Sequence, residues 1–194
     1  MAITTVLAPS GVSTVLGTVG LSASELHLGE FGTGCSVVSV DITRPAGGDV
    51  NLYALGDCIN TSVGSPTVIS FPNIARVNGG SGYVVKARLL TDQKSNVAQF
   101  RVHLFHTTPT AIADNSPYLL LWANRANRIG YLDFPPMTTE DGTNSTAAYS
   151  LWTGQIHYKC ASASRIIYAV LETKTAFTPT SGQGFYLELS VDNN

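Results

Sequence analysis

The sequence predicts an all-β protein, a jelly-roll-like antiparallel β-sandwich with an extended N-terminal arm and at most one short helix. Three observations lead to this prediction. Apolar and polar residues alternate with a period of two in the best-defined segments, which is typical of half-buried strands. Glycine, proline and small polar residues separate those segments at short intervals. Roughly eight strands with irregular connections favour two packed sheets.

The length of the chain fits one β domain preceded by a short extension. The chain has 194 residues, enough for a single sandwich with a full core. No internal repeat and no break in composition separates a second domain after the first 30 residues. We therefore predict an extended arm at residues 1–30 and a single β-sandwich domain at residues 31–194.

The first 30 residues carry no charged side chain before Glu25. Their β-branched and glycine content disfavours a helix, and they are too apolar for a solvated disordered tail. Two interpretations remain, an extended arm that lies on a neighbouring subunit and an ordinary first pair of strands of the domain. We predict the arm.

Strands are predicted wherever the alternation is clear. In Gly184–Val191 the core-facing positions are Phe185, Leu187, Leu189 and Val191, and in Val97–His106 the core face begins with Ala98 and Phe100. The complete set of predicted strands is Cys35–Ile42, Pro66–Phe71, Tyr83–Leu90, Val97–His106, Arg128–Phe134, Tyr149–Cys160, Arg165–Thr173 and Gly184–Val191.

Two neighbouring strands, Tyr83–Leu90 and Val97–His106, are joined by the short polar link "TDQKSN", which predicts a hairpin. Such a hairpin places four basic or titratable residues on one sheet face with no carboxylate among them. Like charges across a strand pair are unfavourable, so acidic groups from the other sheet, another subunit or a nucleic acid would balance them. The alternative is a solvated face with screened charges. We predict protein-interface residues at Lys86, Arg88, Arg101 and His103.

A short helix is predicted in "DNSPYLLLWANRAN", with Ser116 as the N-cap and Pro117 at the first helical position. The apolar run 119–122 also fits a buried strand, and that alternative stays open.

Composition excludes several classes of function. Charged residues make up 12% of the chain, about half the usual ~25%, so we expect other subunits to cover much of the surface. A net charge of −2 argues against direct binding of nucleic acid. No stretch approaches the ~20 apolar residues that a membrane span needs. The first basic residue is Arg44, so the N-terminus lacks the cationic region of a signal peptide.

The motifs of common enzymes are missing. "GGSGY" at residues 79–83 lacks the final glycine of a nucleophile elbow and precedes a strand, whereas that elbow precedes a helix. "GEFGTGCSVV" at residues 29–38 lacks the third glycine of a dinucleotide fingerprint. The four histidines show no metal-ligand spacing. We predict no catalytic residues, no cofactor and no metal.

The three cysteines, Cys35, Cys58 and Cys160, are far apart and odd in number. That pattern fits neither a disulfide framework nor a zinc knuckle. We predict reduced thiols in a protein made in the cytosol.

The block "NIARVNGGSGYVVKARLLTDQKSNVAQFRVHLFHTTPT" at residues 73–110 resembles a family of tailed-bacteriophage virion proteins. These proteins share an "ARV.GGSG" turn, a strand ending in "LTD" and a strand ending in "LF...P". "DNSPYLLLWANRANRIGYLDF" and the terminal "TPTSGQGFYLELSVDNN" are similar to the same pattern, so the resemblance covers roughly residues 70–194. The shared residues are turns and core positions and carry no catalytic motif.

The resemblance implies a structural role, as in jelly-roll decoration or cement proteins of the phage head. It implies the major capsid protein and further copies of this chain, as a dimer or trimer, as partners. It places the protein on the capsid exterior, after assembly in the host cytoplasm. The alternative is a tail or fibre module that binds host glycan, with sugars stacked on Trp122, Tyr149, Trp152 and Tyr158.

Overall fold

The structure, a computed structural model, describes residues 5–7, 13–15, 35–46, 50–140 and 145–193. The chain divides into two units, residues 1–33 and 34–194. In the first unit, strand β1 (Thr5–Leu7) pairs antiparallel with β2 (Ser13–Val15). The rest of the predicted arm, including Glu25, lies outside the described residues, so the arm and its role stay a prediction.

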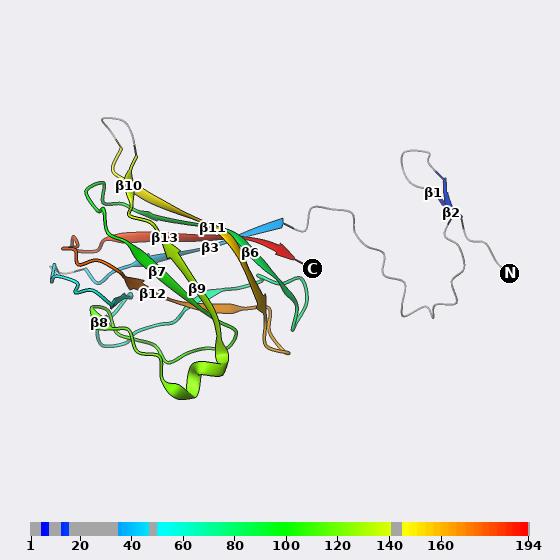
Figure 1. The fold of residues 1–194 in the computed structure, drawn as a ribbon, viewed down its shortest axis with the longest axis horizontal. Helices are drawn as coiled ribbons and strands as arrows, with labels where there is room; N and C mark the ends of the chain where they lie inside the picture. Colours follow the sequence, from blue (N-terminus) through cyan, green and yellow to red (C-terminus); the bar gives the residue numbers. More distant parts are fainter. Residues whose placement is uncertain (1–4, 8–12, 16–34, 47–49, 141–144, 194) are drawn as a thin grey trace. The chain divides into compact units, whose positions relative to one another are not determined.

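The second unit is an antiparallel β-sandwich, which confirms the predicted fold class (Figure 1). Each of the eight predicted strand segments contains a strand. The five-stranded sheet has the order β10 (Thr138–Thr139), β11 (Ala148–Lys159), β6 (Ser81–Thr91), β13 (Gly184–Asn193), β3 (Cys35–Thr43). The six-stranded sheet has the order β8 (Ser116–Pro117), β4 (Asp57–Ile59), β12 (Ile167–Thr173), β7 (Phe100–Phe105), β9 (Arg128–Phe134), with β5 (Ile69–Phe71) also paired to β12.

The strand pairs of the sandwich are nested, which defines a jelly roll. The first strand, β3, pairs with the last, β13, and β4 and β5 pair with the next to last, β12. Further inside the sequence, β6 pairs with β11 and β7 pairs with β9. This nesting produces the two sheets of a jelly roll and sends the chain from one sheet to the other between β6 and β7.

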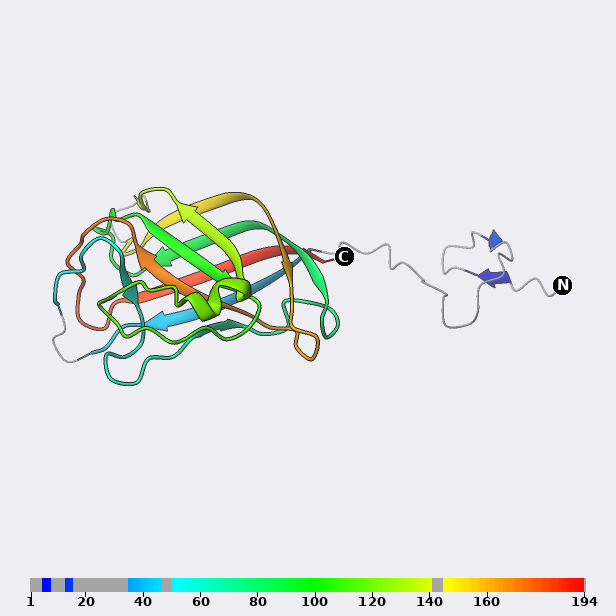
Figure 2. The ribbon, with the colours of Figure 1, turned by 60° about the horizontal axis from the view of Figure 1, so that its bottom comes forward.

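The core lies between the two sheets, which Figure 2 shows as two layers. Every predicted core position of β13 and β7 is buried, because inward and outward side chains alternate along each strand. Their contribution to the core comprises Phe185, Leu187, Leu189 and Val191 from β13, and Phe100, Val102 and Leu104 from β7 with Ala98 just before it.

Strand β6 departs from strict alternation at a β-bulge. Lys86 pairs with Ser190 and Val84 pairs with Val191, so Val85 is an extra residue without a partner on β13. The bulge shifts the inward face, and Val84 and Ala87 are both buried. Strict alternation along this strand predicts that Val84 shares the outer face with Lys86, and the bulge makes that prediction wrong.

The predicted helix begins in the wrong place. Ser116 and Pro117 form the short strand β8, which pairs with β4 at the edge of its sheet. An edge position suits Pro117, because proline has no N–H to offer a further strand. The helical turn is a 3-10 helix, η1 (Trp122–Asn127), drawn as a coiled ribbon in Figure 1, and no side chain caps it. Within the part of the chain that the structure describes, no helix is long and apolar enough to cross a membrane.

Candidate functional site

The four predicted interface residues do not form a single stripe. Lys86 and Arg88 lie on β6, in the five-stranded sheet, whereas Arg101 and His103 lie on β7, in the six-stranded sheet. The predicted pairing of these two strands as a hairpin is wrong, because the jelly-roll connection between β6 and β7 crosses from one sheet to the other. Period-two alternation is the same in a hairpin and in a crossover, so the sequence pattern does not distinguish them.

Carboxylates of the same chain pair with the arginines, which corrects the expectation that none lies among them. The Arg88 guanidinium donates to Oε2 of Glu188 on the adjacent strand β13, at 2.9 Å. Arg101 forms a two-bond pair with Asp133 on β9, with Nη2 2.8 Å from Oδ2. The arginines therefore need no carboxylate from a partner to be paired. Lys86 is exposed, and its interface role, like that of the two arginines, stays a prediction.

His103 is buried, with only 2% of its surface exposed. Its Nε2 lies 2.6 Å from Oε2 of Glu172, and the Arg128 guanidinium donates to its Nδ1 at 3.2 Å. Because arginine can only donate, Nδ1 accepts, and the imidazole is neutral with its proton on Nε2. His103 therefore serves an internal network and offers a partner no accessible surface, which corrects its prediction as a surface contact.

The surroundings of His103 keep it neutral. Burial lowers the pKa of its imidazole, and the positive charges of Arg128 and Arg101 lower that pKa further, against the opposing effect of Glu172. Burial alone would raise the pKa of Glu172, but hydrogen bonds from His103 and from Lys174, whose Nζ lies 3.2 Å from Oε1, hold it below its usual value. The pair therefore consists of a carboxylate and a neutral imidazole at neutral pH.

Three large apolar side chains are exposed on the segment that runs from the end of β8 to the first residue of η1. Leu119 is 64% exposed, Leu121 is 40% exposed and Trp122 is 77% exposed. The intervening Leu120 and the preceding Tyr118 instead pack inward against a small apolar cluster. We call Leu119, Leu121 and Trp122 the apolar ridge. The Arg125 guanidinium lies over the Trp122 ring, 4.3 Å from its centroid, and donates to the Trp122 carbonyl at 2.7 Å.

Sequence reasoning did not identify this ridge. The run "YLLLW" was assigned to a helix or a buried strand, in which most of its side chains would be covered. One signal was present in the sequence. Five large apolar or aromatic residues, 118–122, directly follow Pro117, and a proline commonly marks the end of a helix or strand. Large exposed apolar side chains gathered in one place are a common mark of an interaction surface.

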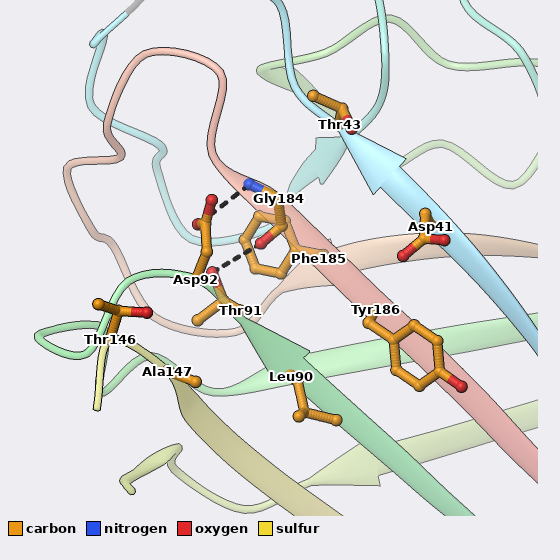
Figure 3. A pocket seen from close by; sticks show the side chains of 10 residues that line it. All are labelled: Asp41, Thr43, Leu90, Thr91, Asp92, Thr146, Ala147, Gly184, Phe185 and Tyr186. Carbon is orange, nitrogen blue, oxygen red and sulfur yellow. Dashed lines mark hydrogen bonds between the residues drawn. The ribbon is translucent and has the colours of Figure 1, made fainter. Parts of the chain in front are cut away.

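A groove lies at the end of the five-stranded sheet where β13 begins (Figure 3). Its volume is about 300 Å³. The Gly184 amide donates to Oδ1 of Asp92 at 3.1 Å, and the Thr91 hydroxyl donates to the Gly184 carbonyl at 2.9 Å, so its floor is fixed by hydrogen bonds. Asp41 and Asp92 make the groove acidic, and its remaining lining is Thr43, Leu90, Thr91, Thr146, Ala147, Gly184, Phe185 and Tyr186.

A second cavity, with a volume of about 340 Å³, lies among the loops that join β6 to β7 and β12 to β13. We call it the loop cavity. None of its lining residues is charged. They are Gln93, Ser95, Asn96, Val97, Ala98, Thr175, Ala176, Phe177, Thr178, Thr180 and Gln183.

A buried ionic network holds the start of the six-stranded sheet. The Arg44 guanidinium donates to Asp114 at 3.2 Å, and both side chains are fully buried. The Tyr53 hydroxyl donates to Asp114 at 2.6 Å and accepts a hydrogen bond from Arg44. The backbone amide of Asn60 donates to Asp114 at 2.8 Å. Burial and the neighbouring Asp114 raise the pKa of Tyr53. All four of these described residues are buried, so the arrangement serves the structure.

The aromatic residues proposed for sugar stacking do not form an exposed cluster. Tyr158 is buried and donates to the Ile74 carbonyl at 2.8 Å. Tyr149 and Trp152 are half-buried, and Trp122 is largely exposed. Among the described residues, no group of three or more His, Cys, Asp or Glu side chains is placed to hold a metal ion.

Comparisons with known proteins identify no family. No family model matches the sequence, and no curated protein matches it. Among solved structures, the chain is similar to the K3 cleaved adhesin domain of Lys-gingipain from Porphyromonas gingivalis, with 12% sequence identity over 71% of each chain and a TM-score of 0.30. A likeness this weak carries no conclusion about function.

Proposed function

We propose that this protein is a non-enzymatic structural protein of a tailed-bacteriophage virion. In this proposal it is a capsid decoration, or cement, protein on the capsid exterior that bridges and stabilises major capsid protein subunits. The resemblance of residues 70–194 to virion proteins supports the proposal. The jelly-roll fold is compatible with it, since viral capsid proteins use this fold, but the same fold also serves lectins and enzymes.

The apolar ridge is the observation that carries the proposal. A tryptophan, two leucines and a stacked arginine occupy one exposed segment of a chain in which only 12% of residues are charged. Tryptophan and arginine are the residues that most often dominate the binding energy of protein interfaces. The ridge therefore has the composition of a docking surface for another protein, here the major capsid protein.

Repetition on a capsid lattice makes such a surface effective. One interface of standard size buries ~1,600 Å² in total, and symmetry repeats it around the shell. Each bound copy that contacts two capsid subunits adds buried area across the boundary between them. The shell then resists the pressure of packaged DNA through many contacts of moderate strength.

The proposal is tested by adding the purified full chain to capsids isolated from phage that lack it, and measuring co-sedimentation. The ridge variant Leu119→Ser/Trp122→Ala should bind at least tenfold more weakly, because loss of a tryptophan anchor typically costs 2 kcal/mol or more and ~1.4 kcal/mol is a factor of ten. Heat or low-salt disruption of the capsids should occur earlier without the bound protein.

The matched control is Val77→Ser. Val77 is 64% exposed, in the loop before β6, and its change also removes an exposed apolar side chain. Its binding should equal that of the wild type. Equal binding by the ridge variant would exclude the ridge as the docking surface. Failure of the wild-type chain to bind capsids, together with its absence from purified virions, would reject the proposed function.

The alternative function, a tail or fibre module that stacks host glycan on an aromatic cluster, has less support. Of its four aromatic residues, Tyr158 is buried and Tyr149 and Trp152 are half-buried. Trp122 already stacks with Arg125 and belongs to the apolar ridge. Location of the chain in the density of purified virions distinguishes head from tail directly.

A further inference from the structure

The five-stranded sheet ends in a long strand whose outer edge has no partner. Strand β3 has nine residues, Cys35–Thr43, and pairs with β13 along its whole length without a shift in register. It is the blue arrow that lies beside β13, in red, in Figure 2. Within the part of the chain that the structure describes, no other strand pairs with β3. The unused backbone donors and acceptors of such an edge form a template for a further strand.

Two hydrogen bonds at one end of β3 show which of its residues face the open edge. The Arg44 amide donates to the Gln183 carbonyl at 3.1 Å, whereas the Gly184 carbonyl accepts from the Asp92 amide, on the β6 side, at 3.3 Å. Bonded and non-bonded residue pairs alternate along an antiparallel ladder, so the even-numbered residues of β3 bond to β13. The backbone groups of the odd-numbered residues therefore point to the open edge. These residues are Cys35, Val37, Ser39, Asp41 and Thr43.

The other three edges of the two sheets are protected against the addition of a strand. β10 has two residues, and β8 has two residues of which one is Pro117, which has no N–H to offer. β9 carries the charged Arg128 and Asp133, and a β-bulge interrupts its pairing with β7. Natural sheets protect their edges by these means. β3 contains no proline and no lysine, and Asp41 is its one charged residue. Among the four edges of the described sheets, only β3 is long, regular and unprotected.

The core is incompletely covered along this edge. In the adjacent strand β13, the four inward-facing side chains are at most 2% exposed. On β3 the inward-facing Val38 and Val40 pack against the same core but stay partly exposed, because no described strand lies on their other side. An added strand would cover both valines if it presented aliphatic side chains at alternate positions.

A second copy of β3 meets this requirement. In an antiparallel pair with a two-fold axis at Ser39, Val38 of each copy lies opposite Val40 of the other, so the exposed valines cover one another. The two Asp41 carboxylates are then four residues apart along the strands, about 14 Å at ~3.4 Å per residue. An axis at Val40 would instead place them at diagonal positions ~7–8 Å apart, where like charges repel. The axis at Ser39 is therefore favoured.

We propose that two copies of this chain associate through the open edges of their β3 strands, which joins their five-stranded sheets into one continuous sheet. The odd-numbered residues exchange backbone hydrogen bonds, and the valines complete the core at the junction. In strand addition the backbone bonds supply affinity and the alternate side chains set the register. The apolar ridge follows β8 in the other sheet. The β3 contact therefore does not depend on attachment to a capsid, and the two proposals fail independently.

The first test measures the oligomeric state of the purified full chain by sedimentation equilibrium over a wide range of concentration. The wild type should form a dimer. Ser39→Pro removes an N–H that faces the open edge, where an edge strand tolerates proline, so the monomer should fold. Because both copies lose this donor, dimerisation should weaken roughly tenfold or more. Circular dichroism checks the fold.

The matched control is Thr139→Pro in β10, at the opposite edge of the same sheet. The Glu140 amide donates to the Ala147 carbonyl at 3.0 Å, so by alternation the Thr139 N–H also points away from the sheet. This variant makes the same kind of change at an edge that is outside the proposed contact. It should dimerise as the wild type does.

A second test measures the register and does not depend on the proline variant. In a Cys35→Ser background, Ser39→Cys should form a disulfide between two copies under mild oxidation with diamide. Opposite residues of an antiparallel pair have Cα atoms ~4.5–5.5 Å apart, which a disulfide can bridge. Val37→Cys is exposed on the same face, but its two copies would lie about 14 Å apart, beyond the ~7 Å limit, and should not crosslink.

Three results would overturn the inference. The first is a wild-type chain that remains monomeric at every concentration. The second is a folded Ser39→Pro variant that dimerises as strongly as the wild type, which would place the contact on another surface. The third is equal crosslinking of Ser39→Cys and Val37→Cys, which would show that the strands do not meet about an axis at Ser39. If Ser39→Pro does not fold, the comparison of the two cysteine variants decides the question.

Discussion

The imidazole of His103 lies flat against the phenol ring of Tyr118, with ring centroids 3.8 Å apart and ring planes 4° apart. This stack joins the outer face of β7 to the residue that immediately precedes the apolar ridge. The Tyr118 backbone amide also donates to the Gly56 carbonyl at 2.7 Å, so the segment is held at two points. The position of the ridge therefore depends on a neutral, buried histidine.

Stability should fall as the pH is lowered from 7 to 5. Burial holds the pKa of His103 below its ordinary value of 6.5, so the unfolded chain binds the proton more tightly than the folded protein does. The stability that neutral His103 provides is complete above pH ~6.5 and is lost as the pH falls through the folded pKa, with a slope of at most ~1.4 kcal/mol per pH unit. Urea unfolding at each pH measures this slope.

The variant His103→Gln should flatten this pH dependence. The matched control is His157→Gln, because His157 is exposed on β11. Glu172 does not contribute to the slope between pH 7 and 5, because its pKa lies below 4.5. The folding free energy that ionised Glu172 contributes is therefore lost only at more acid pH. A slope that is unchanged in His103→Gln would show that another group titrates in this range.

Asp114→Asn should cost about 3–5 kcal/mol of unfolding free energy, because it removes the negative charge from a carboxylate that is fully buried against the Arg44 guanidinium. The control, Asp133→Asn, breaks a pair whose carboxylate is 49% exposed, and should cost no more than ~1 kcal/mol. Chemical denaturation of both variants gives the comparison. A loss below ~1 kcal/mol for Asp114→Asn would mean that water or a rearranged side chain compensates the arginine.

Only Cys35 should react with a thiol reagent in the folded protein. Cys35 is exposed, whereas Cys58 and Cys160 are buried. Burial raises the pKa of the Cys58 thiol, as do the nearby charges of Glu172, Asp57 and Asp114, and burial raises that of Cys160. At pH 7.5, mass spectrometry after brief alkylation should find one modified thiol in native protein and three in denaturant. The Cys35→Ser variant should show no rapid reaction, and a mobility shift on reduction would contradict three free thiols.

Deletion of residues 2–25 should leave a folded β-sandwich and weaken assembly. Every strand of the two packed sheets lies between Cys35 and Asn193, so the deletion removes none of their partners. The far-ultraviolet circular dichroism and the urea midpoint should be close to those of the full chain, and association measured by sedimentation should decrease. Outright unfolding of the shortened chain would show that the N-terminal residues supply part of the core.

Local patterns in the sequence predicted the strands well. The alternation in 184–191 identified the strand and its four core residues, because the inward face of a strand depends only on a period of two. The same rule failed on β6, where the extra residue Val85 reverses the faces without leaving a mark in the composition. It also missed the short strands β4, β8 and β10, which have too few residues for a period to be visible.

An all-β sandwich, the positions of its long strands and most of their buried side chains could be predicted from the sequence, because these features follow from local alternation and turn residues. The pairing of the strands became known from the three-dimensional fold. The strand pairing places Lys86 and Arg88 in one sheet and Arg101 and His103 in the other. It also brings a carboxylate to three of these residues. The pairs are Arg88 with Glu188, Arg101 with Asp133 and His103 with Glu172. The fold also brings Asn96 and Gln183, which are far apart in the sequence, to the lining of the same cavity. Strand pairing depends on contacts between residues that are far apart in the sequence, and no short stretch of sequence contains both partners of such a contact.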